Sequence, residues 1–207
     1  YLTHQVGIPL TDIDWYQAGV NEPGRTEKVA LKIPPGVRYT PVPDRSLTEM
    51  LLAKDLDAVL SARPPQHFLD GKPGIMRLFP DFLAAEEAYW QETRIFPIMH
   101  VVVIRADILE RHPWVAMNLL KALEEAKNRS VQRVLDFSAS RVPIPWGSEY
   151  ANRAVNIFGP DYWPYGIKQN LVTLESFLQY AYEQGVCHRH LKPEELFPAT
   201  VQSSFKI

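Results

Sequence analysis

A single histidine, His100, stands inside an apolar run that extends from Ile98 to Ile104, "IMHVVVI". Imidazole titrates near neutral pH, so a histidine beside a ligand is suited to donate or accept a proton. Two interpretations stay open at this point. His100 is either a core residue that bonds to a main-chain carbonyl, or it belongs to a strand that lines a ligand-binding cleft.

Three potential metal ligands follow closely in "CHRH", which contains Cys187, His188 and His190. No carboxylate supports them before Glu194 and Glu195, and the motif comes directly after a predicted helix end. Histidines near helix ends commonly bond to free carbonyls. We therefore favour a structural role for this motif over a metal site, and we predict no metal.

The loop "FGPDYWPYG", residues 158–166, concentrates aromatic side chains between prolines. Tyr162, Trp163 and Tyr165 have two interpretations: they stack on an aromatic ligand, or they fill a packed seam against neighbouring elements. We favour packing, because aromatic residues and prolines commonly form the core of ordered loops.

Composition narrows the class of protein. The chain has 207 residues, a net charge of -2 and 11% aromatic residues, as expected for a globular protein without a basic surface for nucleic acid. No apolar run is long enough to span a membrane. One cysteine excludes an internal disulfide and fits a reducing compartment, so we expect a cytoplasmic protein. The chain begins at Tyr1 and not at methionine, and no signal peptide is visible, so we expect an N-terminal part to be missing.

Strand and helix patterns alternate in the first half. Short β-rich runs at residues 29–33 and 37–42 flank a Pro-Pro-Gly turn, and further strands are predicted at 57–61 and 98–104. Between them lie a helix opened by the capping box Ser46-Leu47-Thr48-Glu49 and a helix over residues 82–93. Buried strands that alternate with helices predict an α/β lobe with a mostly parallel sheet.

The second half reads as mostly helical. The predicted helices cover residues 106–112, 113–135 with Pro113 as first residue, 149–158 and 174–184. Thr173 is the expected N-cap of the last helix, and Gly185 the residue that ends it. We therefore expect an α/β lobe at residues 1–97, followed by a strand and a helical C-terminal region at residues 98–207.

Four stretches together resemble the 4,5-dihydroxyphthalate decarboxylase family: "DIDWYQAGVNEPGR", "VPDRSLTEMLLAKDLDAVLSARPP", "IFPIMHVVVIRADILERHPWVAMNLLKALEEAK" and "YAYEQGVCHRHLKPEELF". The resemblance implies a type 2 periplasmic binding protein-like fold, in which two α/β lobes enclose a ligand. It also implies that residues 1–97 form the second lobe, that the strand at 98–104 is a hinge strand, and that the first lobe is incomplete.

The resemblance implies a lyase that removes one carboxylate from a dihydroxyphthalate and needs no cofactor. Such a reaction requires a general acid, for which we expect His100, and a base toward the phenol, for which Glu22 is the candidate. The alternative for Glu22, a solvated carboxylate in a loop, is favoured by the sequence alone. Guanidinium groups bind carboxylates with two parallel hydrogen bonds. The expected substrate-binding residues are Arg63, Arg25, Arg105, Ser61 and Asn21.

An alternative of a different class shares this fold: a solute-binding protein that captures a small anionic or aromatic ligand for an importer without chemistry. A third interpretation is that the protein acts on another ring acid. We expect a small aromatic dicarboxylate as the partner and neither nucleic acid nor membrane. Pairing of chains into a homo-oligomer is also consistent with an incomplete lobe.

Overall fold

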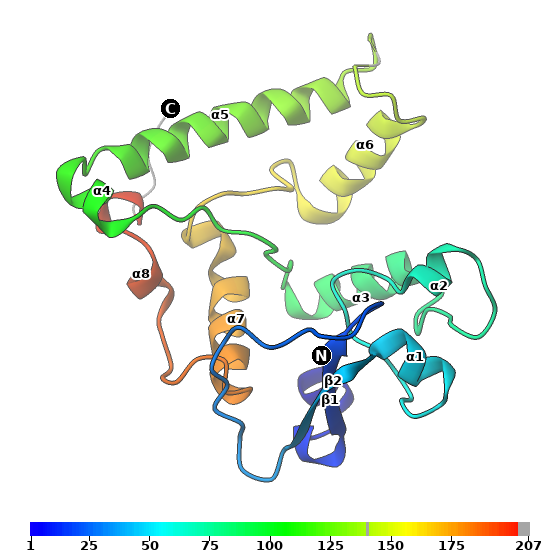
Figure 1. Ribbon diagram of the computed structural model, residues 1–207. Helices are drawn as coiled ribbons and strands as arrows, with labels where there is room; N and C mark the ends of the chain where they lie inside the picture. The colour runs from blue at the N-terminus through cyan, green and yellow to red at the C-terminus, as the bar shows by residue number, and fades with distance from the viewer. Residues whose placement is uncertain (140, 203–207) are drawn as a thin grey trace. The chain divides into compact units, whose positions relative to one another are not determined.

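The computed structural model describes residues 1–139 and 141–202, and the chain divides into two compact units (Figure 1). The first unit comprises Tyr1–Ala85 and Tyr180–Arg189, and the second comprises Glu86–Gln179 and His190–Ile207. Within the described residues, no helix is both long and apolar enough to cross a membrane.

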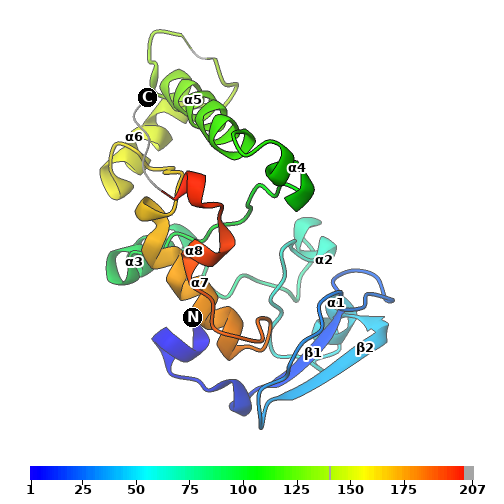
Figure 2. The same cartoon turned by 90° about the vertical axis from the view of Figure 1, so that its left-hand side faces the viewer.

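The first unit is built around two parallel strands that lie side by side (Figure 2). Trp15 pairs with Tyr39 and Gln17 with Pro41, and the register shifts before Gly19. The elements of this unit are η1 (Leu2–Val6), η2 (Leu10–Asp12), β1 (Asp14–Gly19), β2 (Arg38–Ser46), α1 (Leu47–Leu52) and α2 (Gln66–Leu69). Residues 20–37 connect the strands without a helix.

The capping box at the start of α1 forms as predicted. The Ser46 hydroxyl accepts a hydrogen bond from the Glu49 N–H at 3.2 Å, and the Glu49 carboxylate accepts from the Ser46 N–H at 2.8 Å. Ser46 is completely buried, and Ala18, Leu47 and Met50 are buried too. This capped junction therefore belongs to the small core that holds the end of β2.

The second unit is helical. Its aromatic core is formed by Trp90 and Phe96 against Phe158, and by Phe96 against Trp163, with ring centroids 5.2–5.5 Å apart. The helices are α3 (Phe82–Thr93), which begins in the first unit, α4 (Ala106–Arg111), α5 (Val115–Leu135), α6 (Gly147–Phe158), η3 (Lys168–Asn170), α7 (Leu171–Glu183), which ends in the first unit, α8 (Pro193–Leu196) and η4 (Ala199–Val201).

The aromatic loop packs against other residues of this unit, as the favoured interpretation predicts, although Trp163 stays 50% exposed. Besides Trp163, the ring of Tyr165 lies 5.3 Å from the Lys127 ammonium. Lys127 is buried on α5 and bonds to Glu124 at 2.5 Å and to Asp161, in the loop itself, at 2.9 Å. The ion pair with Asp161 and the contact with the Tyr165 ring connect the loop to α5 through Lys127.

Helices were predicted well, with two corrections at their ends. α5 begins at Val115, so Pro113 precedes the helix. α7 begins at Leu171, so Thr173 is not its N-cap; it is buried in the first turn, where its hydroxyl accepts the Phe96 N–H at 3.1 Å. The role of Thr173 depends on a contact with Phe96, which is far away in the sequence, and local preferences do not report such a contact.

The predicted strands need a larger correction. Only the strand at 37–42 is present, as part of β2, whereas residues 29–33, 57–61 and 98–104 form no strand, and β1 was missed. Residues 97–104 make no main-chain hydrogen bond to any described residue, and the side chains of Val101–Val103 are 59–85% exposed. A strand requires a neighbouring strand to pair with, and among the described residues none is beside these runs. The fold is therefore mixed α/β with a small parallel sheet.

Candidate ligand-binding pocket

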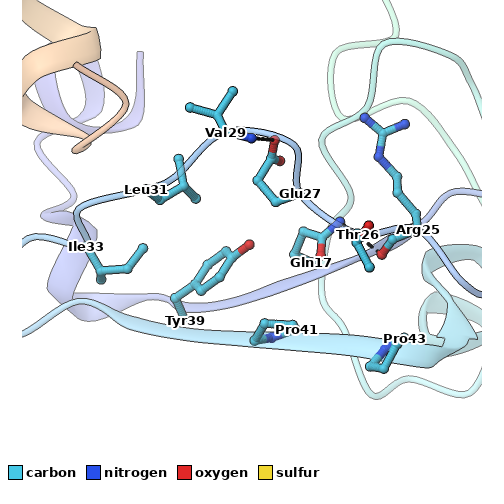
Figure 3. A pocket seen from close by; sticks show the side chains of 10 residues that line it. All are labelled: Gln17, Arg25, Thr26, Glu27, Val29, Leu31, Ile33, Tyr39, Pro41 and Pro43. Carbon is cyan, nitrogen blue, oxygen red and sulfur yellow. Dashed lines mark hydrogen bonds between the residues drawn. The ribbon is translucent and has the colours of Figure 1, made fainter. Parts of the chain in front are cut away.

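A pocket of about 400 Å³ opens over β2 in the first unit (Figure 3). Its size lies within the usual range for small-molecule sites, about 300–1,000 Å³. It is lined by Gln17, Arg25, Thr26, Glu27, Val29, Leu31, Ile33, Tyr39, Pro41 and Pro43. The strands supply one wall, and the connection between them, which arches over β2, supplies the other.

Strand periodicity explains the lower wall. Successive side chains of a strand point to opposite faces, so Tyr39, Pro41 and Pro43 share one face of β2, as Figure 3 shows. Gln17 joins them because it is paired with Pro41 across the sheet. Prolines are tolerated here because β2 is an edge strand in a two-stranded sheet. The result is a flat apolar surface with one hydroxyl and one amide.

The upper wall is tied to the turn that follows α7. The Lys32 N–H donates to the Gly185 carbonyl at 2.9 Å, and the His188 Nε2–H donates to the Ala30 carbonyl, also at 2.9 Å. A carbonyl only accepts, so this bond assigns the His188 proton to Nε2. His188 therefore supports the segment that carries Leu31, and its partner is a loop carbonyl and not the helix-end carbonyl that the sequence led us to expect.

Gly185 has two reasons to be glycine. It ends α7 in a left-handed conformation, with φ +74°. The Gly185 N–H donates to the Tyr182 carbonyl, and the Val186 N–H donates to the Ala181 carbonyl. This is the Schellman arrangement, so the predicted helix end is confirmed. A Cβ at Gly185 would also collide with the Lys32 carbonyl. The close approach of two main chains therefore defines the height of the upper wall.

The loop that carries Arg25 is anchored by main-chain contacts. The Gly24 N–H donates to the Pro43 carbonyl at 2.7 Å, and the Gln17 side-chain amide donates to the Arg25 carbonyl at 3.4 Å. A Cβ at Gly19 would collide with the Glu22 carbonyl, so the chain folds back on itself there. These contacts place Arg25 at the end of the pocket opposite Ile33.

The pocket carries charges of both signs. Hydrogen bonds from the N–H groups of Val29 and Lys28 lower the pKa of Glu27, which is therefore a carboxylate at neutral pH. The positive charge of Arg25 also contributes to lowering the pKa of Glu27. Burial, and then the negative charge of Glu27, raise the pKa of Tyr39, so its hydroxyl stays a donor. Arg25 supplies a permanent cation. Together with the apolar walls, these groups suit a flat ring that carries a negative charge.

The other predicted site residues of the first unit lie outside this lining. The Asn21 Oδ1 accepts from the Gln66 N–H at 2.8 Å and from the Thr48 hydroxyl at 3.2 Å, so it stabilises a loop. Glu22 is exposed. Ser61 donates to the Arg63 carbonyl at 2.6 Å, and both residues are exposed. Their roles toward a substrate stay predictions.

His100 and Arg105 belong to the second unit. His100 is exposed in the unpaired segment, so its expected burial in a strand was wrong. The Arg105 Nε and one of its terminal nitrogens bond to Asp107 at 2.8 Å and 2.6 Å, which raises the pKa of the guanidinium. Arg105 thus already has a carboxylate partner within its own helix start.

Of the residues that line this pocket, the sequence analysis named Arg25 and did not name Gln17, Glu27 or Tyr39. The alternation of Tyr39, Pro41 and Pro43 was the available signal for a shared face. Glu27 had none, because its place in the pocket depends on how residues 20–37 fold back. No group of three or more His, Cys, Asp or Glu suited to a metal occurs among residues 1–139 and 141–202.

Comparison with curated proteins supplies a relative along the whole chain. All of the chain aligns, with 34% identity over 208 residues, with the 4,5-dihydroxyphthalate decarboxylase of Comamonas testosteroni. Over its whole length the chain is similar to a protein named 4,5-dihydroxyphthalate decarboxylase. A second protein of that name, from Pseudomonas putida, is 35% identical over 82 residues, which are 39% of this chain and 32% of that protein. No model of a protein family matches the chain.

The chain spans 63% of the length of the Comamonas decarboxylase. The resemblance recognised in the sequence blocks is thus confirmed at the level of similarity.

Proposed function

We propose that this protein is a lyase that converts a dihydroxyphthalate-type aromatic dicarboxylate into a dihydroxybenzoate and carbon dioxide. The observation that carries the proposal is the 34% identity to a 4,5-dihydroxyphthalate decarboxylase along the entire chain. The pocket over β2 supports it, because Arg25 is one of its lining residues beside apolar walls and hydrogen-bonding groups.

The chemistry limits the mechanism. Direct loss of carbon dioxide would leave an aryl anion, which is too basic to form at neutral pH. A workable route first protonates the ring carbon that bears the carboxylate, with electron release from the para hydroxyl. The carbon–carbon bond then breaks, its electron pair returns to the ring, and the phenol recovers its proton. The substrate oxygen provides the electrons, so no organic cofactor is needed in this route.

The residue roles follow from these needs. Arg25 binds a substrate carboxylate, with Arg63, Arg105, Ser61 and Asn21 as further binding candidates. His100 is proposed as the general acid, because its imidazole is exposed and therefore accessible to a ligand. Glu22 is proposed as the base toward the phenol. Each role can be tested by itself.

The fold and setting expected from the family are proposed with the activity. They are a type 2 periplasmic binding protein-like architecture, with residues 1–97 in one lobe and 98–207 as hinge strand and helical region. The small parallel sheet of the first unit is compatible with such a lobe. A cytoplasmic location is proposed because the one cysteine, Cys187, is free. Pairing of chains stays a prediction.

The decisive experiment incubates the complete protein with 4,5-dihydroxyphthalate and measures carbon dioxide and dihydroxybenzoate. We expect turnover by the wild type, and binding without turnover by His100→Asn. His112→Asn, another histidine of the second unit and outside every proposed role, is the matched control and should retain turnover. Binding without any release of carbon dioxide by the wild type would refute the lyase and support the solute-binding alternative.

A further inference from the structure

We propose that the pocket over β2 recognises both ends of a catechol dicarboxylate, with Arg25 toward the carboxylates and with Glu27 and Tyr39 toward the ring hydroxyls. The inference rests on the proposed function for the identity of the ligand. It also assigns a binding site and an orientation to the ligand. Glu27 and Tyr39, on which the orientation depends, are given no role by the sequence blocks or by the similarity to decarboxylases.

The polar groups of the pocket have unused hydrogen-bonding capacity. Within the described part of the chain, the Arg25 guanidinium has no ion pair and no hydrogen bond, in contrast to Arg105 on Asp107. The Tyr39 hydroxyl likewise has no hydrogen-bond partner among the described residues. An arginine and a half-buried tyrosine left in this state beside a pocket are suited to a ligand that supplies the missing partners.

Glu27 is half used. Its Oε1 accepts the N–H groups of Lys28 at 2.8 Å and Val29 at 3.1 Å, which holds the side chain over the pocket. In the part of the chain that the structure describes, its other oxygen has no hydrogen-bond partner. An ionised carboxylate only accepts hydrogen bonds, so it matches a phenolic O–H and repels a ligand carboxylate.

The two walls select a flat ring. Pro41, Pro43 and the ring of Tyr39 face the pocket from β2, and Leu31 and Ile33 face it from the connection (Figure 3). The pocket is open to solvent at its side, so the ring is held between apolar surfaces while charged groups stay hydrated at the edge. A planar aromatic ligand buries both faces in this arrangement, and an aliphatic diacid does not.

Orientation follows from the signs of charge. Carboxylates are drawn to Arg25 and repelled from Glu27, whereas hydroxyl groups bond to Glu27 and accept from Tyr39. A ring that carries carboxylates on one edge and hydroxyls on the opposite edge satisfies both ends together. Phthalate itself satisfies only the Arg25 end, and catechol only the other.

Calorimetry on the complete protein tests this assignment with two probes, phthalate and 4,5-dihydroxyphthalate. Arg25→Gln should raise the Kd of both probes by about ten- to a hundredfold, as expected for loss of a charged hydrogen bond. Tyr39→Phe should raise the Kd of 4,5-dihydroxyphthalate by about two- to tenfold and leave that of phthalate unchanged. Glu27→Gln should weaken 4,5-dihydroxyphthalate and not phthalate.

Matched controls lie on the same two strands. Tyr16→Phe removes a hydroxyl from β1, and Arg45→Gln removes a guanidinium from the far end of β2, and neither residue lines the pocket. Both variants should bind the two probes as the wild type does. Arg25→Lys keeps the charge without the fork and should recover part of the affinity. Circular dichroism checks that each variant is folded.

The outcomes separate this inference from the proposed function. Unchanged affinities in all three pocket variants would overturn the site, even if the wild type releases carbon dioxide. Loss of binding in the variants without turnover by the wild type would support the site and refute the lyase. Failure of the wild type to bind either probe would overturn both.

Discussion

Replacing Gly185 by alanine tests how the upper wall of the pocket is held. The alanine must adopt φ near +74°, which costs an L-residue about 1–2 kcal/mol. Its Cβ must also clear the Lys32 carbonyl, and because that atom is main chain, the segment has to move as a whole. Such a movement breaks the 2.9 Å bond from the Lys32 N–H to the Gly185 carbonyl, worth about 1 kcal/mol. We expect a loss of about 2–3 kcal/mol in the free energy of unfolding.

Gly7→Ala isolates the conformational part of this cost. Gly7 ends η1 with φ +79°, and a Cβ added there would have no atom within 4 Å. Gly7→Ala therefore shares the conformational cost of Gly185→Ala but not its collision with main chain. Both variants restrict the unfolded chain equally, and that contribution cancels between them. Urea unfolding followed by circular dichroism should place Gly185→Ala about 1 kcal/mol below Gly7→Ala in stability.

Gly185→Ala should also have a measurable effect close to the substitution. Hydrogen exchange at the Lys32 amide should accelerate in Gly185→Ala and stay slow in Gly7→Ala, and the Kd of 4,5-dihydroxyphthalate should rise several-fold only in the former. The close approach of the two main chains would be refuted if the two variants had equal free energies of unfolding and if hydrogen exchange at the Lys32 amide stayed at its wild-type rate in Gly185→Ala.

Three further predictions concern the supports of the fold. Lys127→Ala should destabilise the complete protein in urea by about 3 kcal/mol, at the lower end for breaking a buried pair because Asp161 stays half-exposed. Burial lowers the pKa of Lys127, but its hydrogen bonds outweigh this and raise that pKa above 10.5. The wild type should therefore lose this stability only as the pH rises through the raised value, with no such loss in Lys127→Ala. Thr173→Val should cost about 1–3 kcal/mol in thermal unfolding, because it leaves a main-chain N–H after α3 without its acceptor; no change would contradict that bond. His188→Gln should accelerate hydrogen exchange in the segment around Ala30, and Zn²⁺ should not raise the melting temperature of the wild type above that of this variant; a zinc-dependent difference would revive the metal site.

The sequence predicted those parts of the fold that neighbouring residues determine. The capping box from Ser46 to Glu49 and the turn at Gly185 are closed by bonds within a few residues, so their residue types are sufficient to recognise them. The helix positions followed from apolar periodicity for the same reason. Their exact starts did not, because Thr173 is held by a residue far away in the chain.

Strands could not be assigned with the same success. The run around Val101 has the composition of a buried strand, yet composition does not provide the neighbour with which a strand must pair. β1, in contrast, was missed because Asp14, Gln17 and Gly19 give it a weak strand pattern. It exists because β2 lies beside it.

For the pocket, too, local features could be predicted from the sequence and tertiary features could not. By itself, the sequence determined the chemical groups and the local turns: the guanidinium of Arg25 in a glycine-containing loop, and the imidazole of His188 after a helix end. Only the tertiary structure decided that residues 20–37 fold back over β2 and bring Arg25, Glu27 and Tyr39 around one pocket. The physical reason is that local motifs depend on contacts a few residues apart, whereas a pocket depends on main chains far apart in sequence approaching closely, as Lys32 and Gly185 do.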